Sequence, residues 1–396
     1  MCLMCDAMSR RDFLKLSALL SAGAALPLVM QQQARAAAEP DAPVRVGYLP
    51  IVDAAPLLVA HGLGLFDKAG VKAERPVMFR SWSQLTEAFI GGRVNVIHML
   101  SPVTIWARYQ AKLPAKVVAW NHTNGSALTV APQISRVEEL EGKTVAVPFW
   151  YSIHNVVLQQ ILRSAGLQTV TSAPGKKQVR LLVLSPADMV PALAAGQIQG
   201  FIVAEPFNAL AETRHVGRIL RFTGDVWQNH ACCVVMMHES DLSMRPAWSQ
   251  SVTDALVNAQ QWIRQHRAET AQLLSHSDEH RYTPHDADVL RQVLLPTPAM
   301  QASWQKDGAI RHDAWHQQRI DFQPWPYASY FASLTDQLKQ TVMEGNSDFL
   351  ARLNGQQVAA DLVASDFVRQ SIVRAGGMTA FGLPDGAFDR EETIAP

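Results

Sequence analysis

One pattern of apolar and polar positions occurs twice along this chain. Residues 85–102, LTEAFIGGRVNVIHMLSP, align with residues 189–206, MVPALAAGQIQGFIVAEP, at a constant offset and without a gap. In each copy apolar residues recur three and four positions apart, as on one face of a helix, and a glycine turn then leads into a short apolar strand. The repeat distance exceeds the roughly 20–50 residues of solenoid repeats, so it predicts two similar α/β lobes.

The rest of the chain extends this α/β interpretation. Strands are expected at residues 44–49, 94–100, 115–120, 127–130, 144–147, 181–184 and 232–237, and helices at 55–66, 82–90, 102–110, 155–164, 248–266, 286–295 and 327–343. Loops at the carboxyl ends of strands bind ligands in open α/β sheets, so the two lobes would face a shared crevice.

The order of these elements predicts that the second lobe is an insertion in the first. Lobe 1 would comprise residues 43–127 plus 234–396, and lobe 2 residues 128–233. Residues 127–130 and 231–235 would cross between the lobes and act as a hinge. From Pro246 onward the pattern is mainly helical, which predicts a helical C-terminal extension packed on lobe 1.

Length, composition and charge agree with this interpretation and exclude one class of function. The chain has 396 residues, of which 48% are apolar and 18% charged, enough for about two domains with substantial cores. Basic and acidic residues balance at 35 each, whereas a nucleic-acid-binding surface requires a clustered basic excess.

The N-terminus carries an export signal. Arg10 and Arg11 precede a moderately apolar run at residues 16–30 and a small-residue segment at 34–38. This arrangement predicts a twin-arginine signal peptide over residues 1–36 and a periplasmic location. The alternative is an uncleaved membrane anchor, but about 15 apolar residues are short for a span that needs about 20.

The four cysteines fall into two pairs. Cys2 and Cys5 lie in the predicted signal, whereas Cys232 and Cys233 would enter an oxidising compartment. With His230 nearby, Cys232 and Cys233 are weak candidates for metal ligands. The preferred interpretation is two small buried residues in a strand, so we expect no metal and no cofactor.

Candidate ligand-binding residues occupy the loops that follow the predicted strands. They are Asp53, Ser81 and Trp82 in the first lobe, Asn124, Gly125 and Ser126 at the crossing, and Tyr151, Ser152, His154 and Glu205 in the second lobe. Free backbone N–H groups at helix N-termini favour an anion or a polar oxygen, and the aromatic rings would form an apolar wall. Asp53 and Ser81 have an alternative role as helix caps. We also expect Trp82 and His154 to line one pocket from opposite lobes.

No arrangement of residues indicates catalysis. The sequence lacks the G-x-S-x-G, H-E-x-x-H and P-loop motifs, and no carboxylates are paired at an informative spacing. We therefore expect a protein that is not an enzyme.

Four segments resemble the substrate-binding proteins of nitrate, bicarbonate and cyanate ABC transporters, within a wider group that binds sulfonates, taurine and thiamine precursors. They are GYLPIVDAAPLLVAHGLGLFDKAGV at 47–71, SW at 81–82, IHML at 97–100 and AEPFN at 204–208. The resemblance implies a hinged, two-lobed periplasmic-binding-protein fold of type II. It also implies a protein that closes around a small molecule and delivers it to an inner-membrane permease with its ATPase. We expect the protein to be a monomer.

Two departures from that family bear on the ligand. Trp82 and His154 match positions that line the anion pocket of the nitrate binders, but Ser126 stands where those proteins have a glutamine. Cys232 or Cys233 stands where they have a lysine. Because that counter-charge is missing, we predict weak or no affinity for nitrate and a different small anion or small organic solute as ligand.

Two other functions remain as alternatives. A periplasmic sensor would present the ligand to a membrane receptor. A metal-dependent enzyme related to the thiamine-pyrimidine synthases, which share the fold, would need a cysteine-rich iron-binding segment, whereas this chain offers only Cys232 and Cys233.

Overall fold

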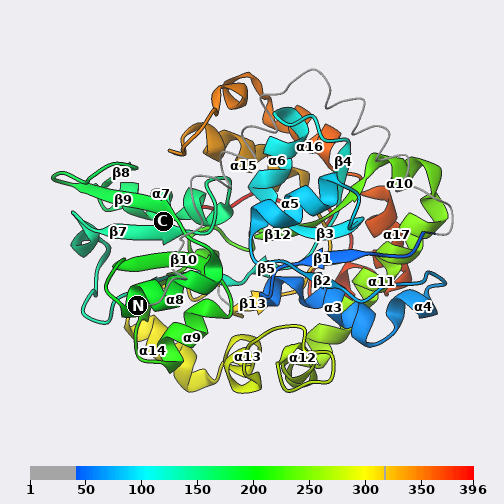
Figure 1. The fold of residues 1–396 in the computed structure, drawn as a ribbon, viewed down its shortest axis with the longest axis horizontal. Helices are drawn as coiled ribbons and strands as arrows, with labels where there is room; N and C mark the ends of the chain where they lie inside the picture. Colours follow the sequence, from blue (N-terminus) through cyan, green and yellow to red (C-terminus); the bar gives the residue numbers. More distant parts are fainter. Residues whose placement is uncertain (1–41, 316–317) are drawn as a thin grey trace, which may run out of the picture.

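The computed structural model describes residues 42–315 and 318–396, so the predicted signal peptide lies outside the described residues. Two sheets form the centres of two lobes that lie side by side (Figure 1). The first sheet has the strand order β2-β1-β3-β12-β4 and the second β11-β6-β10-β7-β9-β8. The predicted two-lobed α/β fold is therefore confirmed.

The first sheet is built from both ends of the predicted lobe 1. Its strands are β1 (Val46–Tyr48), β2 (Val77–Met78), β3 (Val96–Leu100), β4 (Ala115–Trp120) and β12 (Cys233–His238). β12 runs antiparallel between β3 and β4, whereas β1 is parallel to both of its neighbours. The helices that connect these strands are α3 (Ala55–Gly62), α4 (Leu65–Lys68), α5 (Trp82–Ile90) and α6 (Ser101–Tyr109).

The second sheet repeats this arrangement. Its strands are β6 (Ser126–Val130), β7 (Thr144–Val147), β8 (Gln168–Val170), β9 (Gln178–Val183), β10 (Gly200–Ala204) and β11 (Arg218–Phe222), and its helices are α7 (Ile153–Ser164), α8 (Pro186–Ala194) and α9 (Phe207–Thr213). The order β9-β7-β10-β6-β11 parallels β2-β1-β3-β12-β4, with one antiparallel strand, β6 or β12, at the same place. Sequence reasoning missed β8, which adds an outer edge, and also the edge strands β2 and β11.

The internal repeat has a direct structural counterpart in the units α5–β3 and α8–β10. Both units turn at a glycine, Gly92 or Gly196, and both glycines have a φ of 69°. A side chain at this left-handed φ is strained, so glycine is the residue that lets the helix end and the strand begin within a few positions.

The C-terminal part is helical, as predicted, and covers lobe 1. It contains α10 (Glu239–Met244), α11 (Pro246–Gln265), α12 (Arg267–Leu274), α13 (Ala287–Leu294), α14 (Pro298–Lys306), α15 (Ala328–Lys339), α16 (Gly355–Leu362) and α17 (Asp366–Arg374). α11 packs against α3, α4 and α17, and α15 against α6 and α16. Within the described ranges no helix combines the length and apolarity needed to cross a membrane.

One part of this extension packs on the second lobe. We expected all of residues 234–396 to pack with lobe 1, but α13 contacts α9, and the ring of Trp304 in α14 lies 4.9 Å from the ring of Phe222 in β11. α12, α13 and α14 thus run along one edge of both lobes (Figure 1). The cause is apolar burial, because Trp304 and Ile310 complete a small core cluster that includes Ile219 of β11.

After α14 the chain returns to the junction of the lobes. β13 (Ile320–Asp321) pairs with β5 (Thr123–Asn124), immediately before the crossing strand β6. Gly125 links β5 to β6 with a φ of 79°, and a Cβ there would lie 2.8 Å from Cδ1 of Ile320. Glycine is required at this position because of both its φ and the close approach of β13.

Candidate functional site

Polar side chains from both lobes meet at the ends of the strands that face the lobe junction. Asp53 lies in a short 3₁₀ turn after β1, His122 between β4 and β5, and Cys232 immediately before β12. Ser126 begins β6, and His154 lies in the first turn of α7. All five side chains are at most 1% exposed, so the site is enclosed.

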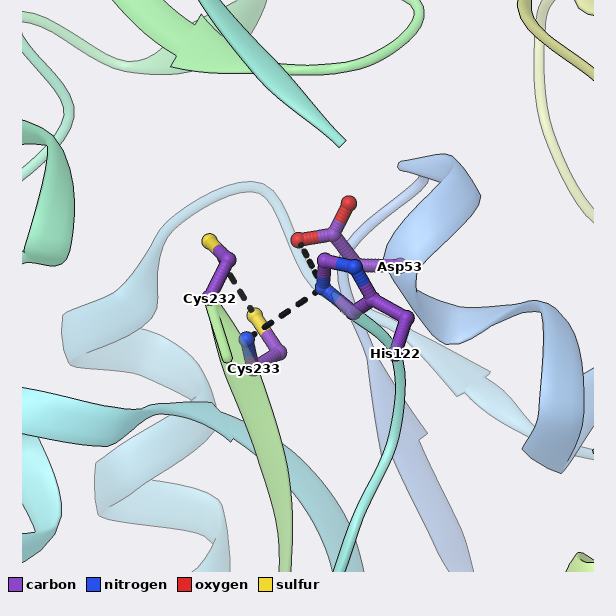
Figure 2. A group of neighbouring side chains, drawn as sticks. All are labelled: Asp53, His122, Cys232 and Cys233. Atoms are coloured by element: carbon purple, nitrogen blue, oxygen red, sulfur yellow. Dashed lines mark hydrogen bonds and ion pairs between the residues drawn. The ribbon is translucent and has the colours of Figure 1, made fainter. Parts of the chain in front are cut away.

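The first-lobe residues form a compact cluster (Figure 2). Nε2 of His122 lies 2.9 Å from Oδ2 of Asp53, and the backbone N–H of Cys233 points at the same nitrogen from 3.3 Å. Sγ of Cys232 lies 4.0 Å from Sγ of Cys233, so both thiols are free. One potential ligand atom from each of Asp53, His122, Cys232 and Cys233 lies within 4.8 Å of all the others.

Burial and mutual contact change the acidities of these groups. Burial raises the pKa of Asp53 to about 6, against the effect of His122. Burial opposes protonation of His122, but the neighbouring Asp53 carboxylate prevails and raises the pKa of His122 to about 10. These pKa values favour an ionised Asp53 beside a charged His122 at neutral pH, whereas the N–H of Cys233 favours an unprotonated Nε2.

The two thiols differ in acidity although they are adjacent. Burial disfavours the thiolate of Cys232, but the hydrogen bond to Cys233 and the interactions with His154 and His122 lower its pKa well below the ordinary value. Burial and the neighbouring Cys232 sulfur raise the pKa of Cys233 well above it. The pair can therefore hold one thiolate, on Cys232.

The second lobe contributes a hydrogen-bonded pair that contacts this cluster. Oγ of Ser126 lies 2.9 Å from Nε2 of His154, and the same nitrogen lies 3.7 Å from Sγ of Cys232. A backbone hydrogen bond from Val52 to the carbonyl of Glu205, 2.9 Å long, also joins the lobes close by. The structure thus places Ser126 and His154 against the cluster that contains Asp53, and their joint role in ligand binding stays a prediction.

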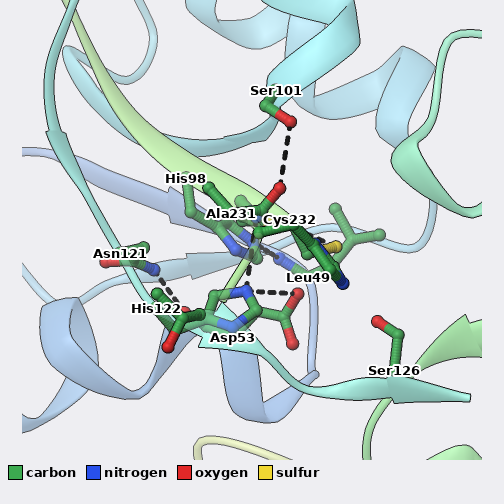
Figure 3. A network of polar contacts seen from close by, with 12 residues as sticks. Leu49, Asp53, His98, Ser101, Asn121, His122, Ser126, Ala231 and Cys232 are labelled. Atoms are coloured by element: carbon green, nitrogen blue, oxygen red, sulfur yellow. Dashed lines mark hydrogen bonds and ion pairs between the residues drawn. The ribbon is translucent and has the colours of Figure 1, made fainter. Parts of the chain in front are cut away.

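A wider polar network surrounds the cluster (Figure 3). The side-chain amide of Asn121 donates to the backbone carbonyl of Asp53, and the N–H of Leu49 donates to Nε2 of His98 over 2.8 Å. Burial lowers the pKa of His98 to about 3, which keeps this imidazole neutral. His98 is thus a neutral buried histidine whose Nε2 accepts from Leu49, while its Nδ1 is buried without a hydrogen-bond partner.

Several predicted site residues have structural contacts of their own. Ser81 caps α5 by accepting from the N–H of Gln84 over 3.3 Å, and Ser152 caps α7 by accepting from the N–H of Asn155 over 3.1 Å. The ring of Trp82 lies 5.3 Å from that of His98 in its own lobe, while its indole N–H is buried without a hydrogen-bond partner. A shared pocket of Trp82 and His154 stays a prediction.

The remaining candidates lie at the crossing or farther away. The N–H of Gly125 donates to the carbonyl of Arg319 over 2.9 Å, and the side chain of Asn124 contacts Asn229 at 3.5 Å. The hydroxyl of Tyr151 donates to the carbonyl of Asn346 over 3.2 Å, in the C-terminal extension. The N–H of Gly125, the amide nitrogen of Asn124 and the hydroxyl of Tyr151 are therefore already used within the protein, whereas Oδ1 of Asn124 is buried without a hydrogen-bond partner.

Glu205 is held by a residue that sequence reasoning missed. Its carboxylate is fully buried, and its Oε1 lies 2.5 Å from Nε of Arg319, which is also fully buried. Arg319 contacts Glu212 as well, at 3.2 Å. Glu205 therefore anchors to the second lobe the segment that follows α14 and contains Arg319 and β13. We call this segment the C-terminal strap.

His230, a weak metal candidate, is likewise engaged elsewhere. Its Nε2 lies 2.9 Å from Oγ1 of Thr223, and burial lowers its pKa to about 4. The most important missed residue is His122. Its signal was present, because a histidine two residues after the apolar strand at residues 115–120 belongs to the same crevice-facing set as Asp53.

Comparison with known proteins agrees with this structure. The sequence profile of the NMT1-like family matches residues 37–275, and that of the twin-arginine translocation signal matches residues 7–27. A nitrate/nitrite binding protein, NrtA, from Nostoc sp. is 26% identical over 239 residues, covering 55% of this chain and 53% of the relative. A nitrate import ATP-binding protein, NrtC, from Synechocystis sp. is 27% identical over 245 residues, covering 58% of this chain and 36% of that protein. The chain thus spans about half or less of the length of these curated relatives.

Solved structures share the fold at lower identity. The periplasmic nitrate-binding protein NrtA from Synechocystis superposes with a TM-score of 0.71 at 19% identity, over 89% of this chain and 93% of that one. A zinc-bound ligand-binding component of an ABC-type import system from Staphylococcus aureus superposes with a TM-score of 0.65 at 21% identity, over 83% of this chain and 98% of that one. The desulfurization enzyme DSZB superposes with a TM-score of 0.51 at 15% identity, over 84% of this chain and 99% of that one.

The profile matches confirm two predictions. The twin-arginine signal establishes export to the periplasm. Together with the two-lobed fold, the match over residues 37–275 shows that this chain belongs to the NMT1-like family.

Proposed function

We propose that the chain is the solute-binding component of an ABC importer and that it binds a small solute between its lobes. The observation that carries this proposal is the convergence of Asp53, His122 and Cys232 from the first lobe with Ser126 and His154 from the second. A ligand held by such a site contacts both lobes, so its binding energy favours the closed arrangement over the open one.

The lobes that would move are those built on the two sheets, close to the expected division into residues 43–127 with 234–396 and residues 128–233. Ser126, at the start of β6, belongs with the second lobe, whereas Cys232 and Cys233, at the start of β12, belong with the first. α13 and α14 pack on the second lobe. Residues 127–130 and 231–235 would act as the hinge. We propose that the protein is a monomer and hands its ligand to an inner-membrane permease and its ATPase. The relatives named NrtA and NrtC support this assignment.

Nitrate is a poor candidate for the ligand. A buried monovalent anion needs a cation or several fixed donors to offset its lost hydration. The cluster instead contains the Asp53 carboxylate, which already uses the charge of His122. A further anion beside this carboxylate would be repelled, so weak nitrate affinity is expected.

We further propose that the chain catalyses no reaction, as the binding-protein names of its relatives suggest. One contact would favour an enzyme, namely the 3.7 Å approach of Nε2 of His154 to Sγ of Cys232, because a histidine can activate a thiol nucleophile. The fold also occurs in an enzyme, DSZB.

The test is calorimetric titration of the mature chain from residue 37 with nitrate, bicarbonate, cyanate and short alkanesulfonates, combined with small-angle scattering. A bound probe should reduce the radius of gyration and remain chemically unchanged after recovery. His154→Ala and Ser126→Ala should weaken its binding at least tenfold. Ser164→Ala, at the far end of α7, should not. Binding without compaction, or equal affinity in the His154 variant, would contradict the proposal.

A further inference from the structure

The first-lobe cluster has the composition of a metal site. Asp53, His122, Cys232 and Cys233 supply one oxygen, one nitrogen and two sulfurs, all fully buried and mutually within 4.8 Å. Three of the four come from positions far apart in the sequence, so the fold itself brings them together. Donors of these three kinds are those that bind Zn²⁺ in proteins.

The spacing of the donors is close to that of a tetrahedral site (Figure 2). Tetrahedral Zn²⁺ with Zn–S bonds of about 2.3 Å places its two sulfurs about 3.8 Å apart. Sγ of Cys232 and Sγ of Cys233 are 4.0 Å apart. Nε2 of His122 and Oδ2 of Asp53 are 2.9 Å apart, and Zn²⁺ would separate them to about 3.4 Å. Movements of a few tenths of an ångström therefore suffice for these two pairs, and the remaining donor pairs, which lie within 4.8 Å, would close to about 3.6 Å.

The two sulfurs lie on one side because of their position in the chain. Consecutive side chains of a regular strand point to opposite faces. Cys232 lies one residue before β12 begins, outside the regular pleat, and both sulfurs can approach a common point. This placement makes adjacent cysteines usable as a pair of ligands.

The cluster also leaves polar atoms without hydrogen bonds. Both carboxylate oxygens of Asp53 lack hydrogen-bond partners apart from the ion pair with His122, and Nδ1 of His122 is buried and unpartnered. Buried polar atoms without partners are costly, and coordination of a cation satisfies carboxylate oxygens directly.

We propose that Asp53, His122, Cys232 and Cys233 bind a thiophilic divalent cation of the Zn²⁺ type, and that this cation is the solute taken up between the lobes. On binding, the protons of the thiols and of His122 pass to the buffer, and the four side chains become ligands. His154 then lies over the loaded site from the second lobe, next to Cys232. Only the assignment of the cation as solute rests on the proposed importer function.

The experiment uses tag-free mature protein from residue 37, reduced and handled without oxygen. Of the four cysteines in the sequence, this chain retains only Cys232 and Cys233. Zn²⁺ is titrated against a chromophoric chelator, and Co²⁺ is added separately as a spectroscopic probe. We expect one Zn²⁺ per chain, and a thiolate-to-Co²⁺ charge-transfer band with the visible absorption of a tetrahedral site. With no other thiols in the chain, the band can arise only from this pair.

Variants assign the ligands. Cys232→Ser and Cys233→Ser should each weaken Zn²⁺ binding at least a hundredfold and diminish the charge-transfer band, and Asp53→Asn should weaken binding about tenfold. His230→Gln is the matched control, since His230 is buried nearby but outside the cluster, and it should retain wild-type affinity. The wild-type Co²⁺ spectrum provides a readout even if a variant fails to fold.

The outcomes separate this inference from the proposed function. Absence of stoichiometric Zn²⁺ from reduced wild-type protein, or a Co²⁺ spectrum without the thiolate band, overturns the metal site. If an anion still compacts the protein in that case, the solute-binding function stands. Zn²⁺ binding with the expected spectrum and with compaction supports both proposals. Binding with that spectrum but without compaction supports the metal site and overturns the cation as the solute.

Discussion

Replacement of Arg319 by methionine would test how firmly the C-terminal strap is tied to the second lobe. Arg319 is fully buried, its Nε lies 2.5 Å from Oε1 of Glu205, and its guanidinium lies 5.4 Å from the ring centre of Phe222 and 5.1 Å from that of Trp304. Methionine keeps much of the aliphatic stem and the ring contacts but removes the charge. The Glu205 carboxylate then retains a single hydrogen bond, from the N–H of Ala209 at 3.2 Å.

The expected loss in the free energy of unfolding follows from the carboxylate of Glu205, which the substitution leaves buried without its cation. Removing one partner of a buried ion pair typically costs about 3–5 kcal/mol, whereas replacing both by apolar residues is often neutral. We therefore expect Arg319→Met to lower the free energy of unfolding by about 3–5 kcal/mol. The double variant Arg319→Met/Glu205→Leu should lose less than Arg319→Met alone.

The penalty should also depend on pH, with a defined sign. Burial raises the pKa of Glu205, and Arg319 opposes this rise. The folded-state pKa of Glu205 is above its unfolded value even with Arg319 present, and without Arg319 it rises further. The stability of the variant is then lost as pH rises through that folded pKa, and its deficit should be larger at pH 8 than at pH 5.

Urea unfolding of the mature chain, followed by both circular dichroism and tryptophan fluorescence, provides the assay. The two transitions must coincide for a single free energy to apply to a two-lobed protein. Arg136→Met is the control, because the Arg136–Glu139 pair is exposed and 3.7 Å long, and it should change stability by less than about 1 kcal/mol. A loss below about 1 kcal/mol in Arg319→Met, or a double variant no more stable than the single one, would refute the reasoning.

Three further predictions concern stability. Burial lowers the pKa of His238 to about 4, so the folded state loses stability as pH falls below about 6.5, where only the unfolded chain takes up the proton. His238→Gln should abolish about 2–3 kcal/mol of this loss between pH 7 and 4.5. The measurement is urea unfolding, with the exposed-site variant His276→Gln as control. Gly125→Ala should cost about 1–2 kcal/mol or more from its positive φ and the Ile320 contact, and Ile320→Val in the same chain should restore only part of the thermal midpoint. Arg108, the nearest cation, lowers the pKa of Asp361, so Asp361→Asn should reduce stability by up to about 1 kcal/mol at pH 7. This last deficit should vanish as pH falls through the lowered pKa, and equal deficits at pH 7 and at strongly acidic pH would contradict it.

Much of the topology could be predicted from the sequence, because local patterns of apolar residues, glycines and helix caps determine where its helices and strands lie. The repeated helix–glycine–strand unit foretold α5–β3 and α8–β10, and Ser81 and Ser152 precede their helices as caps do. The contents of the site were harder to predict. Some residues chosen from loops, such as Tyr151, have structural contacts instead. The backbone of a loop directs only some of its side chains toward the junction of the lobes, and the sequence does not show which.

The residues that were missed depend on long-range contacts. Arg319 reaches Glu205 across 114 positions, and no periodicity links them. The pairing of Cys232 with Cys233 on one side depends on where β12 begins, and a difference of one residue in this boundary would separate the sulfurs. Local rules could not place these side chains, because the whole fold determines their neighbours.

The position of β12 also dictates an order of assembly during synthesis. This strand supplies the ladder between β3 and β4, yet the ribosome makes it only after the whole of the second sheet. The second sheet is contiguous in sequence, so its strands can pair while residues 233–238 are still in the exit tunnel or not yet made. Until then β3 and β4 have open edges, which are prone to pair with other chains. The cysteines arrive with β12 as the first sheet closes, before synthesis of the C-terminal helices that cover this lobe and complete the cargo for twin-arginine export.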